Sequence, residues 1–219
     1  MDARSYDYQH WVHLVPGRPK SEILFLTPED IQLILDGQSI EFHPTIPYPL
    51  FIRLTTRSPK DCNPDLCDYN CRADSSSEIN QMLRSSERCR SDMLECIQDG
   101  EDIGVVFQPF NPRITLSKEL RLFVYYGNLV AVSAVDEPND LITEDDLRKL
   151  QKYVLELEAL NSSYPNYVAD ACLDSGEIIF IEINPYDPDI TDSILFDWTD
   201  DKDILFPRVA PTIPAYRFE

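Results

Sequence analysis

The strongest constraint on this chain is a long β-hairpin in its last third. Two runs of strand-forming residues, 167–173 and 177–185, flank a turn that ends on glycine. Side chains alternate between the two faces of a strand, so Glu182 and Asn184 share one face. The opposite face is apolar and carries Ile179, Ile181 and Ile183. One face of the hairpin therefore belongs to a core, and the other carries oxygen donors.

Whether Asp170 joins these oxygen donors depends on the turn. A two-residue turn would place Asp170 opposite Ile181, on the apolar face. A three-residue loop over 174–176, ending on a left-handed glycine, shifts the register by one. Asp170 then lies opposite Phe180 and diagonal to Glu182. We expect this second register.

Oxygen donors on one strand face suit a hard divalent cation. Magnesium takes carboxylate and amide oxygens and usually keeps substrate phosphates as its remaining ligands. The hairpin therefore predicts a nucleotide-metal site with Asp170, Glu182 and Asn184 as metal ligands. The alternative is a set of ordinary polar residues on a solvent-facing side of a sheet. Two features favour the metal: Pro185 fixes the strand end directly after Asn184, and the other face is apolar.

Composition limits the classes of partner. The 219 residues are 43% hydrophobic, enough for a buried core, and the net charge is −20. That charge opposes tight binding to the phosphate backbone, so we do not expect a nucleic-acid partner. The sequence has no run of about twenty apolar residues, and no apolar signal core follows its start. We expect a cytoplasmic monomer without a membrane segment.

The order of predicted elements gives an α+β fold with antiparallel sheets flanked by helices. Thr27 and Asp30 form a capping pair at the start of a helix that ends at Gly37. The other expected elements are a strand at 47–54, a helix at 78–98 broken at 85–86, a strand at 103–107, a hairpin of 119–126 and 129–135 turning at 127–128, and a helix at 143–160. We expect an N-terminal lobe at 1–104 and a C-terminal lobe at 105–219.

Two basic segments could meet a phosphate. Arg53, Arg57 and Lys60 lie where the strand at 47–54 enters a polar turn, and an ordered cation on short backbone suits phosphate binding. Arg121 shares a strand face with Glu119, which could orient it. The alternatives are a surface loop paired with the acidic background, and the ordinary alternation of a half-exposed sheet.

Other chemistries lack sequence support. The 6 glycines are scattered, which excludes Walker and dinucleotide-binding loops. His10, His13 and His43 all lie early in the chain, without the context of a serine or cysteine nucleophile, so a hydrolytic triad is not expected.

Taken in order, seven segments of the chain resemble the cell division cycle protein 123 family. They are Phe-Ile-Arg-Leu at 51–54, Arg-Ser-Pro-Lys-Asp at 57–61, Glu-Leu-Arg-Leu-Phe-Val at 119–124, Asn-Leu-Val-Ala-Val-Ser at 128–133, Val-Ala-Asp at 168–170, Phe-Ile-Glu-Ile-Asn-Pro-Tyr at 180–186 and Thr-Asp-Ser-Ile-Leu-Phe at 191–196. Each is modest alone, but their order and spacing are specific, and they span about residues 47–198. Glu182 stands where the family more usually has aspartate.

The resemblance implies a function for these residues. Members of the family have an ATP-grasp fold, with the nucleotide between two lobes, and bind ATP with magnesium. Arg53 and Lys60 would approach the phosphates from one lobe and Arg121 from the other. Asp170, Glu182 and Asn184 would hold the metal. Adenine would lie against the strand that contains Val106, Phe107 and Gln108.

Family members act as assembly chaperones for translation initiation factor 2, through its gamma subunit. The resemblance therefore implies that partner for this chain. The alternative is an ATP-dependent ligase that joins a carboxylate to an amine, as many ATP-grasp proteins do. Whether the chain is an enzyme stays open at this point, because a fold alone does not fix its chemistry.

Overall fold

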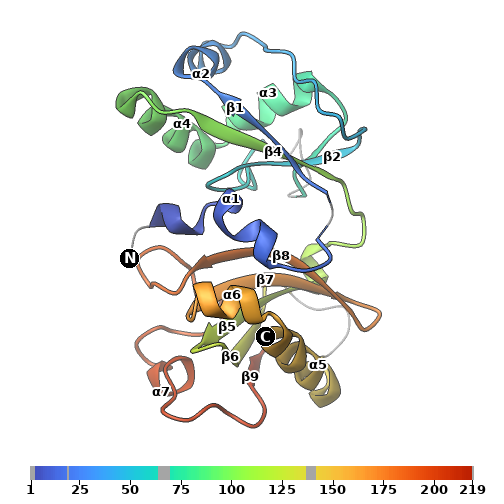
Figure 1. Ribbon diagram of the computed structural model, residues 1–219, viewed down its shortest axis with the longest axis vertical. Helices are drawn as coiled ribbons and strands as arrows, with labels where there is room; N and C mark the ends of the chain where they lie inside the picture. Colours follow the sequence, from blue (N-terminus) through green and yellow to red (C-terminus); the bar gives the residue numbers. More distant parts are fainter. Residues whose placement is uncertain (1–2, 19, 64–69, 137–141, 219) are drawn as a thin grey trace. The chain divides into compact units, whose positions relative to one another are not determined.

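The computed structural model describes residues 3–18, 20–63, 70–136 and 142–218 (Figure 1). Its contacts divide the chain into two compact units. Pro19–Pro112 forms the four-stranded unit, and Met1–Arg18 together with Arg113–Glu219 forms the five-stranded unit. The chain therefore crosses between the units twice.

The four-stranded unit is an antiparallel sheet in the order β1-β4-β2-β3. Its strands are β1 (Glu22–Leu26), β2 (Leu50–Leu54), β3 (Arg72–Ala73) and β4 (Ile103–Pro109), and its helices are α2 (Pro28–Leu35), α3 (Ser76–Ser85) and α4 (Glu87–Asp99). Thr27 and Asp30 form the expected capping box at the start of α2. Ser86 separates α3 from α4, where the sequence indicated a break.

The two faces of this sheet differ. Paired residues on neighbouring strands share a face, and Ile52 pairs with Phe107 on the face that packs against the three helices. Arg53 pairs with Val106 on the opposite face. The core of this unit therefore lies on the helix side of the sheet.

The division between units differs from the expected boundary at 104/105. β4 is an inner strand of the four-stranded sheet, because it pairs with β1 on one side and β2 on the other. It therefore stays with the residues before it, and the units divide after Pro112.

The five-stranded unit is a mostly antiparallel sheet in the order β8-β7-β5-β6-β9. Its strands are β5 (Glu119–Tyr125), β6 (Asn128–Ala134), β7 (Tyr167–Asp174), β8 (Glu177–Pro185) and β9 (Ala215–Arg217). Its helices are α1 (Tyr8–Trp11), α5 (Glu144–Glu156), α6 (Glu158–Ser163) and α7 (Lys202–Leu205), with 3-10 turns η1 (Ala3–Tyr6), η2 (Val12–Leu14) and η3 (Leu116–Lys118). β9 pairs with β6 in parallel. Neither β9 nor β1 was expected from the sequence.

Each face of the five-stranded sheet has its own cover. On one face, the ring of Phe180 lies 5.9 Å from that of Trp11 in α1 and 6.4 Å from that of Tyr153 in α5. On the other face, an apolar cluster is covered from the C-terminal segment by Phe196 and by Leu205 of α7. The polar site described below shares this second face.

The register of the β7–β8 hairpin corrects the sequence prediction. The turn has two residues, Ser175 and Gly176, with φ of 52° and 79°, rather than the three expected. A bulge at Ile181 then shifts the register, so Asp170 lies opposite Glu182 and not opposite Phe180. The predicted proximity of Asp170 to Glu182 survives, but for a different reason.

The bulge also changes which residues face the core. Phe180 pairs with Ala171 and Ile183 pairs with Ala169, so both share the face of these alanines. Ile179 pairs with Cys172, which lies on the face of Asp170. The expectation that three isoleucines form the apolar face was therefore wrong.

Two other local predictions need smaller corrections. The β5–β6 turn falls at Tyr126 and Gly127, with φ of 49° and 70°, one residue before the expected position. Asn128 begins β6, and its side-chain amide donates to the carbonyl of Tyr126 at 2.8 Å. The helix expected at 143–160 is divided into α5 and α6 at Leu157.

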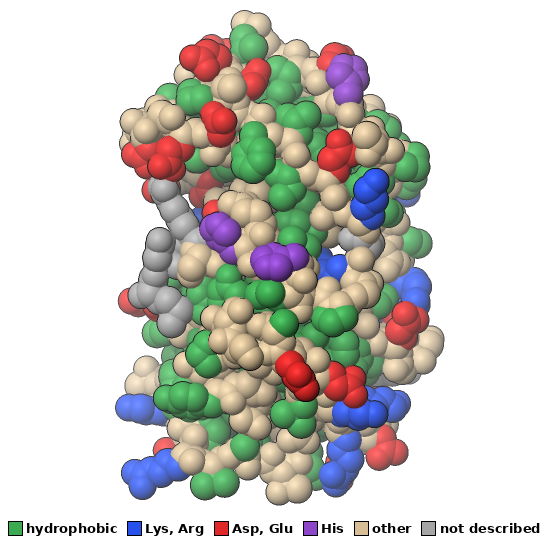
Figure 2. Space-filling model, in the orientation of Figure 1, with side chains coloured by type: hydrophobic (Ala, Val, Ile, Leu, Met, Phe, Trp, Pro, Cys, Tyr) green, Lys and Arg blue, Asp and Glu red, His purple; other side chains and the backbone are tan. Residues whose placement is uncertain are grey.

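The net charge of the chain is −20, but the acidic side chains do not form one continuous patch on the face drawn in Figure 2. Acidic side chains there are scattered among apolar and uncharged ones, and most of the basic side chains lie near the margins of the view. None of the helices in the described ranges combines the length and the apolar character needed to span a bilayer.

Gly104 on β4 packs closely against Thr55, the first residue after β2. A Cβ at this position would lie 2.6 Å from Cγ2 of Thr55 and 2.8 Å from Cγ2 of Ile23. We expect Gly104→Ala to lower the free energy of unfolding by about 1–3 kcal/mol, because both side chains would have to shift. Urea unfolding measures this. Adding Thr55→Ser, which removes one clashing methyl group, should restore part of the loss; unchanged stability of the single variant would contradict the packing.

Candidate functional site

A row of polar side chains crosses four strands of the five-stranded sheet. Glu182 on β8 pairs with Asp170 on β7, Asp170 pairs with Arg121 on β5, and Arg121 pairs with Ser133 on β6. Directly paired residues share a sheet face, so these four side chains lie next to one another. The strand register therefore assembles the site from segments far apart in the sequence.

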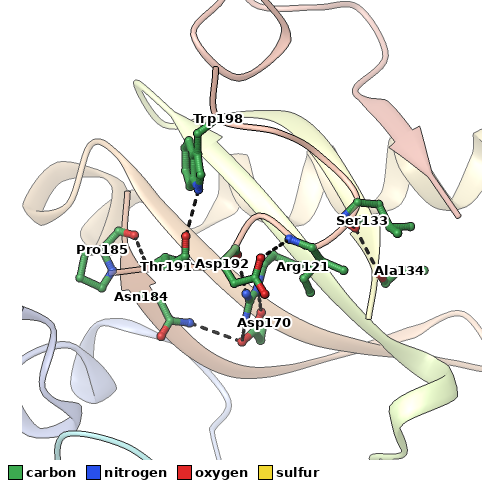
Figure 3. A network of polar contacts seen from close by, with 11 residues as sticks. Arg121, Ser133, Ala134, Asp170, Asn184, Pro185, Thr191, Asp192 and Trp198 are labelled. Atoms are coloured by element: carbon green, nitrogen blue, oxygen red, sulfur yellow. Dashed lines mark hydrogen bonds and ion pairs between the residues drawn. The ribbon is translucent and has the colours of Figure 1, made fainter. Parts of the chain in front are cut away.

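The centre of this row is an ion pair between Arg121 and Asp170. Nε and Nη2 of Arg121 donate to Oδ1 and Oδ2 of Asp170, both at 2.9 Å (Figure 3). The Asp170 side chain is 0% exposed and that of Arg121 is 15% exposed. Two parallel hydrogen bonds between planar groups are the strongest arrangement for such a pair.

The environment keeps the guanidinium charged. Burial lowers the pKa of Arg121, but the charge of Asp170 and its hydrogen bonds raise that pKa by more. Glu182 and Glu119 add smaller contributions in the same direction, and the net effect is a raised pKa. Arg121 is therefore a permanent cation on this face.

Asn184 completes the group of oxygen-bearing side chains. Its Nδ2 donates to Oδ2 of Asp170 at 3.4 Å (Figure 3). Asn184 and Glu182 are both half-buried, and they lie two residues apart on β8. The structure thus brings together the three residues that the sequence indicated as metal ligands.

The segment after β8, residues 191–198, is hydrogen-bonded to this row of polar side chains and to the end of β8. The main-chain carbonyl of Asp192 accepts from Nη1 of Arg121 at 2.6 Å, and the amide of Leu195 donates to Oγ of Ser133 at 3.3 Å. Thr191 donates to the carbonyl of Pro185 at 2.7 Å, and the Trp198 indole donates to the carbonyl of Thr191 at 2.9 Å (Figure 3). The covering segment therefore depends on the same arginine as the site.

The site residues predicted from the sequence included neither Ser133 nor Asp192. Ser133 is fully buried between apolar neighbours on β6, and a lone serine in such a run was the available signal. Asp192 contributes its backbone carbonyl rather than its carboxylate, so its residue type gave no indication of this contact.

The donor set fits magnesium in its chemistry. Asp170, Glu182 and Asn184 offer carboxylate and amide oxygens, and magnesium prefers oxygen ligands. Over the described ranges, no three His, Cys, Asp or Glu side chains are grouped so as to hold a metal ion. This is consistent with a set of two carboxylates and one amide, in which Arg121 already contacts both oxygens of Asp170.

The remaining predicted residues lie in the four-stranded unit. Arg53, Val106 and Gln108 share the sheet face opposite the helices, since Arg53 pairs with Val106, and Gln108 lies two residues further along β4. Phe107 points to the helix side, where its ring lies 5.7 Å from that of Phe42. The side chain of Phe107 therefore belongs to the core of this unit and does not contact a ligand on the opposite face.

Two details limit what these residues can do. Arg53 is 4% exposed, and its guanidinium donates to the carbonyls of Leu54 at 3.0 Å and Thr56 at 3.4 Å. The pairing of β1 with β4 reaches Phe107 and stops before Gln108. Gln108 is 6% exposed, so its side chain is largely buried as well. Lys60 lies half-buried in the loop after β2.

The ion pair makes a direct prediction for stability. Arg121→Met or Asp170→Leu alone should lower the free energy of unfolding by roughly 3–5 kcal/mol, because each leaves a buried charge without its partner. The double variant should recover much of this loss. As a matched control, the exposed pair of Arg72 and Asp74, at 3.0 Å, should cost about 1 kcal/mol or less when broken. Additive losses at Arg121 and Asp170 in urea unfolding would contradict the coupling.

Comparisons with known proteins show which family this chain belongs to and which solved structures it resembles. The D123 family matches the chain over residues 46–205, more than half of its length. No curated protein matches the sequence. Among solved structures, Cdc123 from Schizosaccharomyces pombe is 20% identical and covers 97% of this chain and 94% of that chain, with a TM-score of 0.68. A C-terminally truncated form of that protein gives 19% identity, 96% and 94% coverage and a TM-score of 0.72.

At these identities the likeness to the solved structures shows the fold. The α+β fold with antiparallel sheets and flanking helices that we expected is confirmed, and it is the fold of Cdc123. A RimK domain protein ATP-grasp from Sphaerobacter thermophilus DSM 20745 is more distant, with 15% identity, 84% and 60% coverage and a TM-score of 0.40. The family match covers the segments that carry both Arg121 and the β7–β8 hairpin, and the chain belongs to the D123 family, the family of Cdc123.

Proposed function

We propose that the protein binds ATP with magnesium and acts as an assembly chaperone for translation initiation factor 2. The observation that supports this most is the polar row on the five-stranded sheet. It sets a permanently charged arginine beside two carboxylates and an amide, in a chain of the D123 family. A nucleotide-metal complex needs both cationic and oxygen-donor groups.

In this proposal Asp170, Glu182 and Asn184 hold the magnesium ion, which neutralises charge on the phosphates. Rotation of the Asn184 amide would turn its oxygen toward the ion, since the two ends of the amide have the same shape. Arg121 faces the phosphates. Because Arg121 already satisfies both oxygens of Asp170, we expect magnesium to bind weakly unless nucleotide is present.

In this proposal residues of the four-stranded unit also take part in nucleotide binding. Lys60 and Arg53 approach the phosphates, and adenine lies against the backbone of Val106, Phe107 and Gln108. The common face of Arg53, Val106 and Gln108 supports this proposal.

The partner is the gamma subunit of translation initiation factor 2, and the protein is cytoplasmic. Family membership supports the partner, and the net charge of −20 favours a basic or cation-mediated contact over one with nucleic acid.

Calorimetry with ATP tests the nucleotide site. We expect ATP to bind with magnesium present and to bind much more weakly after chelation. Glu182→Gln should weaken the magnesium-dependent part by on the order of tenfold, because a charged oxygen ligand is lost. Glu177→Gln, an exposed position on the same strand, serves as the control. ATP binding that is independent of magnesium, or equal in both variants, would remove Glu182 from the site.

A second measurement separates the chaperone from a ligase. Purified gamma subunit should bind the protein, and more tightly when ATP and magnesium are present. Bound ATP should be recovered unchanged after long incubation. Release of ADP and phosphate on addition of a carboxylate and an amine would favour ligase chemistry, and no binding of the gamma subunit in either state would contradict the partner.

A further inference from the structure

We propose that Asp61 and Asp92 are positioning residues, which fix the loop that presents Lys60 to a phosphate. The loop, called the Lys60 loop here, comprises residues 55–62 between β2 and β3. This inference rests on the proposed nucleotide binding and adds to it the two side chains that determine where the lysine lies.

The Lys60 loop is held at its start by the sheet. The amide of Thr55 donates to the carbonyl of Gly104 at 2.8 Å, and the amide of Leu54 donates to the carbonyl of Arg57 at 2.8 Å. Gly104 has no side chain, which lets Thr55 approach β4 closely. The first residues of the loop therefore have a defined path.

Asp92 on α4 holds the next part. Its Oδ2 accepts from Oγ1 of Thr56 at 2.5 Å and from Nε of Arg57 at 2.7 Å. Asp92 is only 7% exposed, so its charge is stabilised mainly by these two donors. Consecutive loop residues are thus attached to one buried carboxylate on a helix.

Asp61 holds the far end of the loop to the first turn of the same helix. Its Oδ1 accepts from Oγ of Ser86 at 2.5 Å, and its Oδ2 accepts from the amide of Arg88 at 3.1 Å. Burial raises the pKa of Asp61, but the hydrogen bonds to its carboxylate and the nearby charge of Arg88 together lower it by more, so the pKa is lowered. Ser86 is the residue that caps α4, so the contact joins the loop to a helix terminus that is itself ordered.

Lys60 lies between these two attachments. Ser58 and Pro59 beside it are buried, and the amide of Cys62 donates to the carbonyl of Pro59 at 3.0 Å, which closes a turn around Lys60. A cation on a backbone fixed at both ends loses less freedom on meeting a phosphate than one on a mobile loop. Asp61 and Asp92 therefore act on phosphate binding through Lys60.

The experiment is a set of mutant cycles read by calorimetry with ATP and with adenosine. Asp61→Ala and Asp92→Ala should each weaken ATP binding by on the order of tenfold and leave adenosine binding unchanged. In a Lys60→Met background the same two changes should have no further effect, because the group they position is gone. Asp74→Ala, which breaks an exposed ion pair in the same unit, is the matched control and should leave ATP binding unchanged.

A purely structural role would give a different pattern. Equal losses for ATP and adenosine, or losses that persist in the Lys60→Met background, would overturn the inference, and so would unchanged ATP binding in both alanine variants. If Asp92→Ala does not fold, Thr56→Val, which removes one of the two donors to Asp92, carries the same comparison. Failure of the native protein to bind ATP would instead overturn the proposed function, and this inference with it.

Discussion

The buried ion pair of Arg121 and Asp170 is the interaction on which the five-stranded unit depends. Asp170 is fully buried and its charge needs the guanidinium of Arg121, so the ion pair favours the one register in which these two residues lie opposite each other. The covering segment is tied to the same arginine through the carbonyl of Asp192. The sheet, its cover and the candidate site therefore share one pair of side chains, and a change at either residue acts on all three.

This arrangement affects how function and stability are related. The residues suited to bind a phosphate and a metal satisfy each other in the structure, at 2.9 Å through both oxygens of Asp170. A ligand that carries both charges can offer each of them a new partner at once, whereas a metal ion alone would leave Arg121 without its carboxylate. Under the proposed function, this geometry favours joint binding of nucleotide and metal over separate binding. It also means that alanine at Asp170 would test stability as much as ligand binding, which makes Glu182 and Asn184 the cleaner probes.

The sequence predicted correctly those features of the fold that are determined by residues close together in the chain. Thr27 with Asp30, and the break at Ser86, follow from backbone groups within one helical turn. The register of the β7–β8 hairpin could not be obtained in this way, because no residue type marks the bulge at Ile181. β1 and β9 were missed since a short strand is defined by partners distant in sequence. The predicted group of Asp170, Glu182 and Asn184 was retained only because the two-residue turn and the bulge offset each other.

Arg53, Arg57 and Lys60 are close in sequence, but the chemistry of their side chains gives them different contacts. An arginine has a planar fork of donors that suits carbonyls and carboxylates at fixed positions, and Arg53 and Arg57 are used in that way. A lysine carries a compact charge on a flexible stem, and it tolerates a ligand that arrives and leaves. Spacing alone could not separate these roles, because Asp92 lies on a helix that is distant in sequence and close in the fold. Arg57 is therefore one of the attachments of the loop that carries Lys60.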